Sequence, residues 1–145
     1  MMAVVAATIA NGGVAMVPHV LDRITDDRGE IVEQFEPEGW REAVRPEAAA
    51  AIRAAMVGVV EGGSGTNARI EGVEVAGKTG TAQLGTDPPS SHAWFIAFAG
   101  PPGGEPEVAV AVLVEAQPGI SEVTGGRVAA PVARQVIEAV LNGTQ

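Results

Sequence analysis

The sequence predicts an α+β domain in which an antiparallel sheet is flanked by helices. Segments with helical composition or spacing and segments with strand-like composition both occur along its 145 residues. The connections between the last three strand-like segments are too short for parallel crossovers, so they favour an antiparallel meander. The length suits one domain over residues 1–145. The expected order is helix, hairpin, helix, three strands and helix.

The composition restricts the possible functions. The formal net charge is −9, whereas a nucleic-acid surface needs clustered lysine and arginine, so no nucleic-acid partner is expected. No metal site is expected, because cysteine is absent and the two histidines, His19 and His92, lie far apart in the sequence. No cofactor is expected either. The apolar stretch 1–10 is too short to span a membrane.

The N-terminal elements are a helix and a hairpin. The helix covers residues 1–11 and ends at Gly12-Gly13, but it has no N-cap, so we expect the chain to be a fragment that begins inside a longer helix. Val14–Ile24 and Glu30–Phe35 are the expected hairpin strands, and Thr25–Gly29 is the turn between them.

Pro46 is well placed to start a second helix over residues 46–60. Gly62–Gly65 end this helix and open an expected flexible loop to Ile70. The apolar face expected to pack on the core comprises Ile52, Ala55, Met56, Val59 and Val60.

The C-terminal half is expected to contain three strands and a helix. The strands are residues 73–83, 93–99 with Trp94, Ile96 and Phe98 on one face, and 108–114, and the loops between them are 85–91 and 101–106. The last strand is apolar on both faces, which predicts a central position. The helix 128–141 tolerates Pro131 only in its first turn. Its expected buried face comprises Val128, Val132, Val136, Ala139 and Val140.

Lys78 is the only lysine of the chain. Gly77 and Gly80 leave the backbone bare on either side of it, which suggests that a ligand approaches closely there. Read from Gly72, the stretch Gly72-Val-Glu-Val-Ala-Gly77-Lys78-Thr79 satisfies the pattern of a phosphate-binding P-loop. Read from Lys78, the tripeptide Lys78-Thr79-Gly80 is the third signature of penicillin-binding proteins and serine β-lactamases. A P-loop needs a tight loop followed by a helix, whereas these residues favour a strand, so the second interpretation is preferred.

A strand with these residues has a coherent chemistry. The ammonium of Lys78 can hold a substrate carboxylate or tune a neighbouring hydroxyl, and Thr79 and Thr81 add hydroxyl donors. Gly80 has no Cβ, so an extended peptide can pair along the strand, and a backbone N–H near Thr81 can face a developing oxyanion. The alternative is an exposed lysine that only protects a sheet edge from aggregation.

Four segments, in their order and spacing, resemble the C-terminal part of the transpeptidase domain of class B penicillin-binding proteins, most of all the actinobacterial penicillin-binding protein A type. The segments are Ala7–Pro18, Gly62–Arg69, Val75–Gln83 and His92–Phe98. The resemblance implies a five-stranded antiparallel sheet, of which these residues supply three strands and a hairpin. It also implies a peptidoglycan D,D-transpeptidase that forms a serine acyl-enzyme with stem peptides or β-lactams. Its location would be the extracytoplasmic face of the membrane, with an N-terminal anchor outside these residues.

The same resemblance assigns roles to the strand residues. Lys78 would line the site beside the serine of the second motif. Thr79 and Thr81 would bind the carboxylate of the substrate or β-lactam, with Gly80 between them. The backbone N–H of Thr81 would complete the oxyanion hole, so Lys78 and Thr81 are the expected catalytic residues.

Two signatures of that family are missing from the 145 residues. No serine has a lysine three residues later or an asparagine two residues later, so both Ser-x-x-Lys and Ser-x-Asn are absent. The chain is therefore expected to be inactive alone, and its strand 108–114 is expected to expose an edge that allows a homodimer. A non-catalytic peptide- or β-lactam-binding module is the alternative. His92 is expected to be structural, and Glu71 and Glu74 to be solvated charges.

Overall fold

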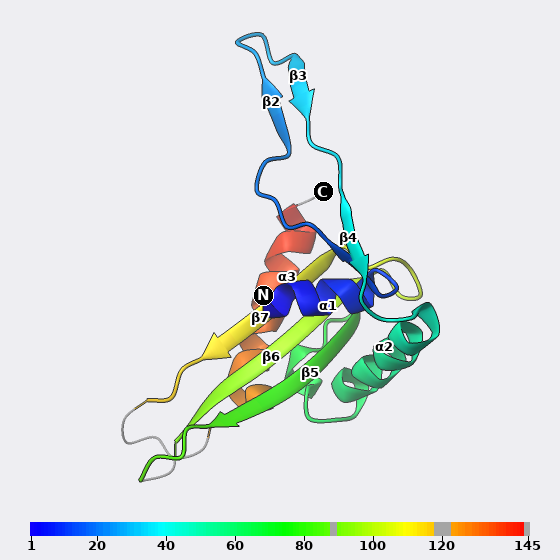
Figure 1. Cartoon of the computed structure of the whole chain (residues 1–145). Coiled ribbons are helices and arrows are strands. Elements are labelled where there is room, and N and C mark those ends of the chain that lie inside the picture. The colour runs from blue at the N-terminus through cyan, green and yellow to red at the C-terminus, as the bar shows by residue number, and fades with distance from the viewer. Residues whose placement is uncertain (88–89, 118–122, 144–145) are drawn as a thin grey trace.

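A computed structural model describes residues 1–87, 90–117 and 123–143, and it confirms the predicted α+β class (Figure 1). The predicted loop 85–91 therefore lies partly outside the described residues, at positions 88 and 89. The helical elements are α1 (Met2–Ala10), α2 (Pro46–Glu61), the 3₁₀ turn η1 (Thr66–Ala68), the π-helical turn η2 (Gly125–Ala129) and α3 (Ala130–Gly143). The strands are β1 (Val14–Met16), β2 (Arg23–Thr25), β3 (Ile31–Gln34), β4 (Gly39–Glu42), β5 (Glu74–Gln83), β6 (Ser91–Gly100) and β7 (Val108–Val114).

The main sheet has the strand order β5-β6-β7, with both pairs antiparallel, as the short connections predict. The central position predicted for residues 108–114 is wrong for the described part of the chain, where β6 lies in the middle and β7 pairs only with β6. Each face of β7 is nevertheless packed against a helix, because α1 lies on one side of the sheet and α3 on the other (Figure 1), and Leu113 is the one residue of the strand that is exposed. Coverage of both faces, rather than a central position, explains why β7 is apolar throughout.

The two faces of the sheet belong to two separate hydrophobic clusters. Phe95, Ala97 and Ala99 of β6 pack with α3, η1 and η2, whereas Phe98 and the partly buried Ile96 pack with α1 and α2. This alternation confirms that Ile96 and Phe98 share a face. The face with Phe95 is the more deeply buried one, since Phe95, Ala97 and Ala99 are at most 1% exposed.

The predicted buried face of α2 is partly wrong. Met56 and Val60 are buried, but Ile52 is 40% exposed and Ala55 is also exposed. The contacts turn the helix so that Arg53, which apolar spacing leaves out, faces β5 and makes an ion pair there. The segment expected to be a flexible loop after α2 instead folds into η1, whose Ala68 is fully buried.

The predicted buried face of α3 is also wrong. The helix buries Ala130, Ala133 and Ile137, while the side chains of a second apolar stripe are exposed by 39–42%. That stripe consists of Val132, Val136 and Val140. Both stripes have helical spacing, and the alanine stripe allows the closer approach to the sheet. Pro131 lies in the first turn of α3, as predicted.

The N-terminal strands are more divided than predicted. The stretch 14–24 contains two strands, because Pro18 lacks a backbone N–H: β1 pairs with the unpredicted β4, and only β2 pairs with β3. The β2–β3 hairpin with its turn near Asp26 is confirmed, and it projects from the body as an arm (Figure 1).

Candidate functional site

The strand β5 is an open edge of the main sheet among the described residues, because it pairs with β6 and with no other strand. The register places Lys78 opposite Ile96 and Thr81 opposite Ala93. Residues Val75–Gly77 are buried, whereas Lys78 and the stretch 81–83 are exposed. The motif Lys78–Thr81 is therefore presented on an edge to which a further extended chain can be added.

Successive side chains of β5 point to opposite faces of the sheet, so Lys78 and Gly80 share one face and Thr79 and Thr81 share the other. The ammonium of Lys78 donates a hydrogen bond to the carbonyl oxygen of Thr79, with 2.5 Å between Nζ and the oxygen. No acidic side chain forms an ion pair with Lys78 among the described residues. Its positive charge therefore faces solvent and is available to an anionic ligand.

The two threonines have different surroundings. The hydroxyl of Thr79 lies 2.8 Å from the hydroxyl of Ser64, which follows α2. Thr81 is exposed and lines an open cavity of about 470 Å³ together with Gln83, Ser91 and Thr124. Both hydroxyls can thus contact a ligand that lies along the edge of β5 on this face.

The sequence suggests that a ligand can approach the backbone closely at both Gly77 and Gly80, but the structure shows that Gly77 is already covered. A Cβ on Gly77 would lie 2.3 Å from Cζ of Phe95, so this glycine accommodates a core aromatic ring. A Cβ on Gly80 would lie 3.1 Å from Cβ of Trp94. On the other side, Gly125 of η2 lies close to the backbones of Trp94 and Gly80, where its own Cβ would clash. Packing therefore explains Gly77, and a close approach of η2 explains Gly125.

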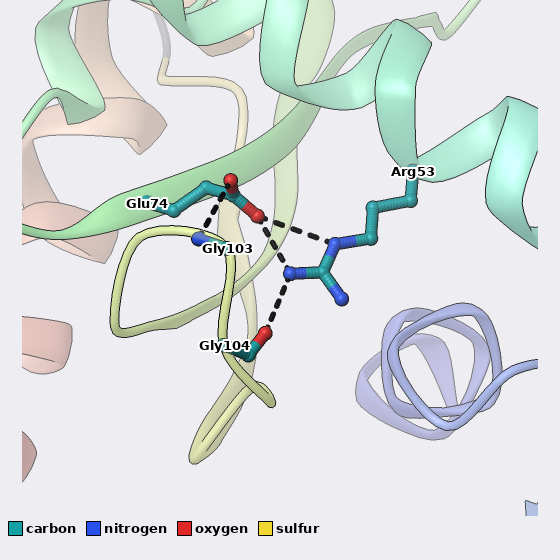
Figure 2. A network of polar contacts seen from close by, with 4 residues as sticks. All are labelled: Arg53, Glu74, Gly103 and Gly104. Atoms are coloured by element: carbon teal, nitrogen blue, oxygen red, sulfur yellow. Dashed lines mark hydrogen bonds and ion pairs between the residues drawn. The ribbon is translucent and has the colours of Figure 1, made fainter.

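An ion-pair network fixes the start of β5 (Figure 2). Arg53 of α2 donates to Glu74, with 2.6 Å between Nη2 and Oε1, and to the carbonyl oxygen of Gly104, 2.8 Å away. The N–H of Gly103 donates to the other carboxylate oxygen of Glu74 at 3.4 Å. The hydrogen bonds from Arg53 hold the pKa of Glu74 below its ordinary value. Glu74 is therefore not the solvated charge that the sequence predicts, and it joins α2, β5 and the β6–β7 loop.

The other candidate sites are not formed. Residues 74–79 of the P-loop pattern lie within β5 and no helix follows them, so the nucleotide-binding alternative is wrong. His92 accepts a hydrogen bond from the N–H of Ala116 at 3.0 Å, in agreement with its predicted structural role. The part of the chain that the structure describes contains no cluster of potential metal ligands.

Sequence reasoning missed three contributors to the site. Arg53, Ser64 and the pair Gly125-Gly126 all contact β5 or its neighbours, although they lie far from Lys78 in the sequence. The glycine pair at the start of a predicted helix was the available signal for η2. No local pattern marked Arg53, and the segment Gly62–Arg69 carried the family resemblance without giving Ser64 a role, because the partners of both residues are set by the tertiary fold.

Comparisons with known proteins agree with the fold. Residues 1–138 match the family model described as penicillin binding protein transpeptidase domain. The chain is 45% identical over 139 residues to the peptidoglycan D,D-transpeptidase PbpA of Mycolicibacterium smegmatis, covering 94% of the chain and 28% of that relative. It is equally identical over 141 residues to PbpA of Mycobacterium tuberculosis H37Rv, covering 96% of the chain and 28% of the relative. The chain thus spans less than a third of the length of these relatives.

Solved structures of penicillin-binding proteins also match the fold of this chain. The ceftriaxone acyl-enzyme complex of penicillin-binding protein A from M. tuberculosis matches with a TM-score of 0.78 and 43% identity, over 96% of this chain and 31% of that one. The D,D-transpeptidase domain of a peptidoglycan glycosyltransferase from Eggerthella lenta matches with a TM-score of 0.79 and 33% identity, over 98% and 31%. Further complexes of the M. tuberculosis protein contain imipenem and penicillin G as acyl-enzymes.

Proposed function

Because this chain belongs to the penicillin-binding protein transpeptidase domain family, we propose that it forms the Lys-Thr-Gly wall of the active site of a peptidoglycan D,D-transpeptidase. The observation that carries the proposal is the open edge of β5, on which Lys78, Thr79 and Thr81 are accessible. The residues 1–145 are then the C-terminal portion of the transpeptidase domain.

The substrate lies along β5 as an added strand in this proposal. The hydroxyls of Thr79 and Thr81 donate to the terminal carboxylate of the stem peptide, or to the carboxylate of a β-lactam. Lys78 supplies a positive charge at the same edge. Gly80 keeps the strand free of a side chain between the two threonines.

The nucleophile is a serine outside these 145 residues, which contain no Ser-x-x-Lys sequence. Its oxygen attacks the carbonyl carbon of the D-Ala-D-Ala bond, and the backbone N–H of Thr81 stabilises the oxyanion that develops. The carbon–nitrogen bond then breaks, the terminal D-alanine leaves with a proton on its amine, and the acyl-enzyme passes its acyl group to an acceptor amine. A β-lactam follows the same first step and remains attached through its opened ring.

Covalent labelling with a fluorescent penicillin tests the proposal. We expect the complete product of the gene that encodes these residues to be labelled, and the 145-residue chain alone to remain unlabelled. Covalent label on the 145-residue chain, or no label on the complete product, would contradict the proposal. Reversible binding of penicillin to the complete product without covalent label would instead support the non-catalytic module.

The substrate also suggests a location. Stem peptides belong to the cell wall, so we place the site on the extracytoplasmic side of the membrane. Among the described residues no helix is both long and apolar enough to cross a bilayer. Treatment of intact cells with a membrane-impermeant amine reagent tests the extracytoplasmic location. Modification of Lys78 in intact cells would support this location, and modification only after lysis would contradict it.

The isolated chain is proposed to dimerise through β7. The outer edge of this strand is unpaired in the described part of the chain, and Leu113 is 41% exposed there. Unpaired backbone groups beside apolar side chains favour strand pairing between copies. Sedimentation of the 145-residue chain over a range of concentrations would show a dimer, whereas a strictly monomeric profile at high concentration would contradict the pairing.

A further inference from the structure

We propose that Ser64 is a positioning residue for the Thr79 hydroxyl, which it orients so that the threonine proton points to the ligand carboxylate. The inference rests on the proposed function of β5 and adds a residue that no sequence motif assigns to it. The observation is the distance of 2.8 Å between Oγ of Ser64 and Oγ1 of Thr79.

The chemistry of a hydroxyl pair gives the direction of this hydrogen bond. Each hydroxyl carries a single proton, so one member of the pair donates and the other accepts. A bond from Thr79 to an ionised carboxylate is stronger than a bond to a neutral hydroxyl. When a carboxylate binds, Thr79 therefore donates to it, and Ser64 donates to Thr79. Oγ1 of Thr79 then accepts a hydrogen bond from Ser64 while it donates to the carboxylate, and Ser64 thereby holds Oγ1 in place.

The backbone around Ser64 is well fixed, although its side chain is exposed. The N–H groups of Gly63 and Gly65 both donate to the carbonyl oxygen of Val59 at the end of α2, at 3.2 and 2.9 Å. On the other side, a Cβ on Gly126 would lie 1.9 Å from the carbonyl oxygen of Ser64, so η2 packs directly on this turn. The turn is thus held between α2 and η2.

The same contacts set the rotamer of Thr79. A Cβ on Gly126 would be 3.4 Å from the methyl carbon of Thr79, so η2 borders the methyl group while Ser64 contacts the hydroxyl. Asn67 ties η2 to this turn, because its Nδ2 donates to the carbonyl oxygen of Gly126 at 2.8 Å. With its methyl and hydroxyl on defined sides, Thr79 presents its oxygen in one direction before the ligand arrives.

The test compares rates of acylation in the complete gene product. We expect Ser64→Ala to lower the second-order rate constant for a penicillin with a free carboxylate by about three- to tenfold, the effect of one hydrogen bond. Ser64→Thr keeps a hydroxyl and should stay within about twofold of the wild type. The matched control is Thr66→Ala, which removes an exposed hydroxyl from the same segment and should leave the rate unchanged.

Two further measurements separate positioning from a general structural effect. For the methyl ester of the same penicillin, which has no ionised carboxylate, Ser64→Ala should have no effect. In a Thr79→Val background Ser64→Ala should also have no further effect, because its partner is gone. Three results would each overturn the role of Ser64 without affecting the proposed function. The first is an equal loss of acylation rate with the acid and the ester, and the second is a further threefold loss from Ser64→Ala in the Thr79→Val background. The third is a wild-type rate for Ser64→Ala. Absence of acylation in the wild type would overturn the proposed function itself.

Discussion

The two halves of β5 differ in what surrounds them. In the anchored half, Glu74–Gly77, Glu74 is tied to α2 and the β6–β7 loop, and Val75–Gly77 are buried. In the presented half, Lys78–Gln83, four of the six residues are exposed, although the pairing with β6 continues to the end. One strand thus combines a part held by the core with a part that is open to a ligand. The comparison teaches that stability and activity should respond to different substitutions along the same ten residues.

The largest effect on stability is expected from Gly77→Ala in the anchored half. The new Cβ would meet the ring of Phe95 at 2.3 Å, and Phe95 is fully buried, so the ring and the sheet must shift. We expect a loss of about 3 kcal/mol in the free energy of unfolding, measured by urea denaturation. Gly58→Ala on α2 is the control, because its Cβ would have no neighbour within 4 Å and should stabilise the helix slightly. Equal changes in the free energy of unfolding for the two variants would contradict the claim that the core holds this half of β5.

A smaller loss is expected from Arg53→Met, which keeps the length of the side chain but removes its hydrogen bonds. Glu74 would then remain half-buried without its cation, at a cost of about 2 kcal/mol in the free energy of unfolding. Arg134→Met removes an exposed pair with Glu138 on α3 and should cost less than about 0.5 kcal/mol. Thermal and urea unfolding of both variants measure this difference, and similar costs would show that the Glu74 network does not anchor β5.

The same network predicts a pH dependence. The pKa of Glu74 is lowered in the folded protein by Arg53, so the folded state binds its proton less readily than the unfolded state does. Its contribution is therefore complete above the ordinary value of 4.5 and is lost as the pH falls through the lowered pKa. The difference in unfolding free energy between the wild type and Glu74→Gln should stay constant down to about pH 5 and shrink at lower pH. A difference that grows on acidification would contradict the ion pair.

The elements that the sequence predicted well are those with a local signal. The meander followed from the short connections, and the edge motif followed from the single lysine with its glycine and threonines. The face of α3 could not be predicted in the same way, because its valine stripe and its alanine stripe both have helical spacing. Only the close approach to the sheet selects Ala133 and Ile137.

The supporting residues of the site depend on contacts between distant segments. Arg53 breaks the apolar spacing of α2, and it is tolerated there because Glu74 and Gly104 receive its protons. The position of Gly77 suggested an approaching ligand, whereas the approaching group is the ring of Phe95. Ser64 meets Thr79 only after α2 and η2 are packed around it. Such pairings are set by tertiary structure and leave no pattern in the sequence.

The smallest effect on stability is expected in the presented half, and it gives the most direct test. Lys78 makes no ion pair among the described residues, so Lys78→Ala should change the free energy of unfolding by less than about 0.5 kcal/mol. In the complete gene product the same substitution should lower the rate of penicillin acylation by at least about a hundredfold, because a charge at the reacting edge is lost. Both quantities should be measured on one preparation. Unchanged acylation, or a loss of acylation that only follows a loss of folding, would contradict the assignment of β5 as the active-site wall.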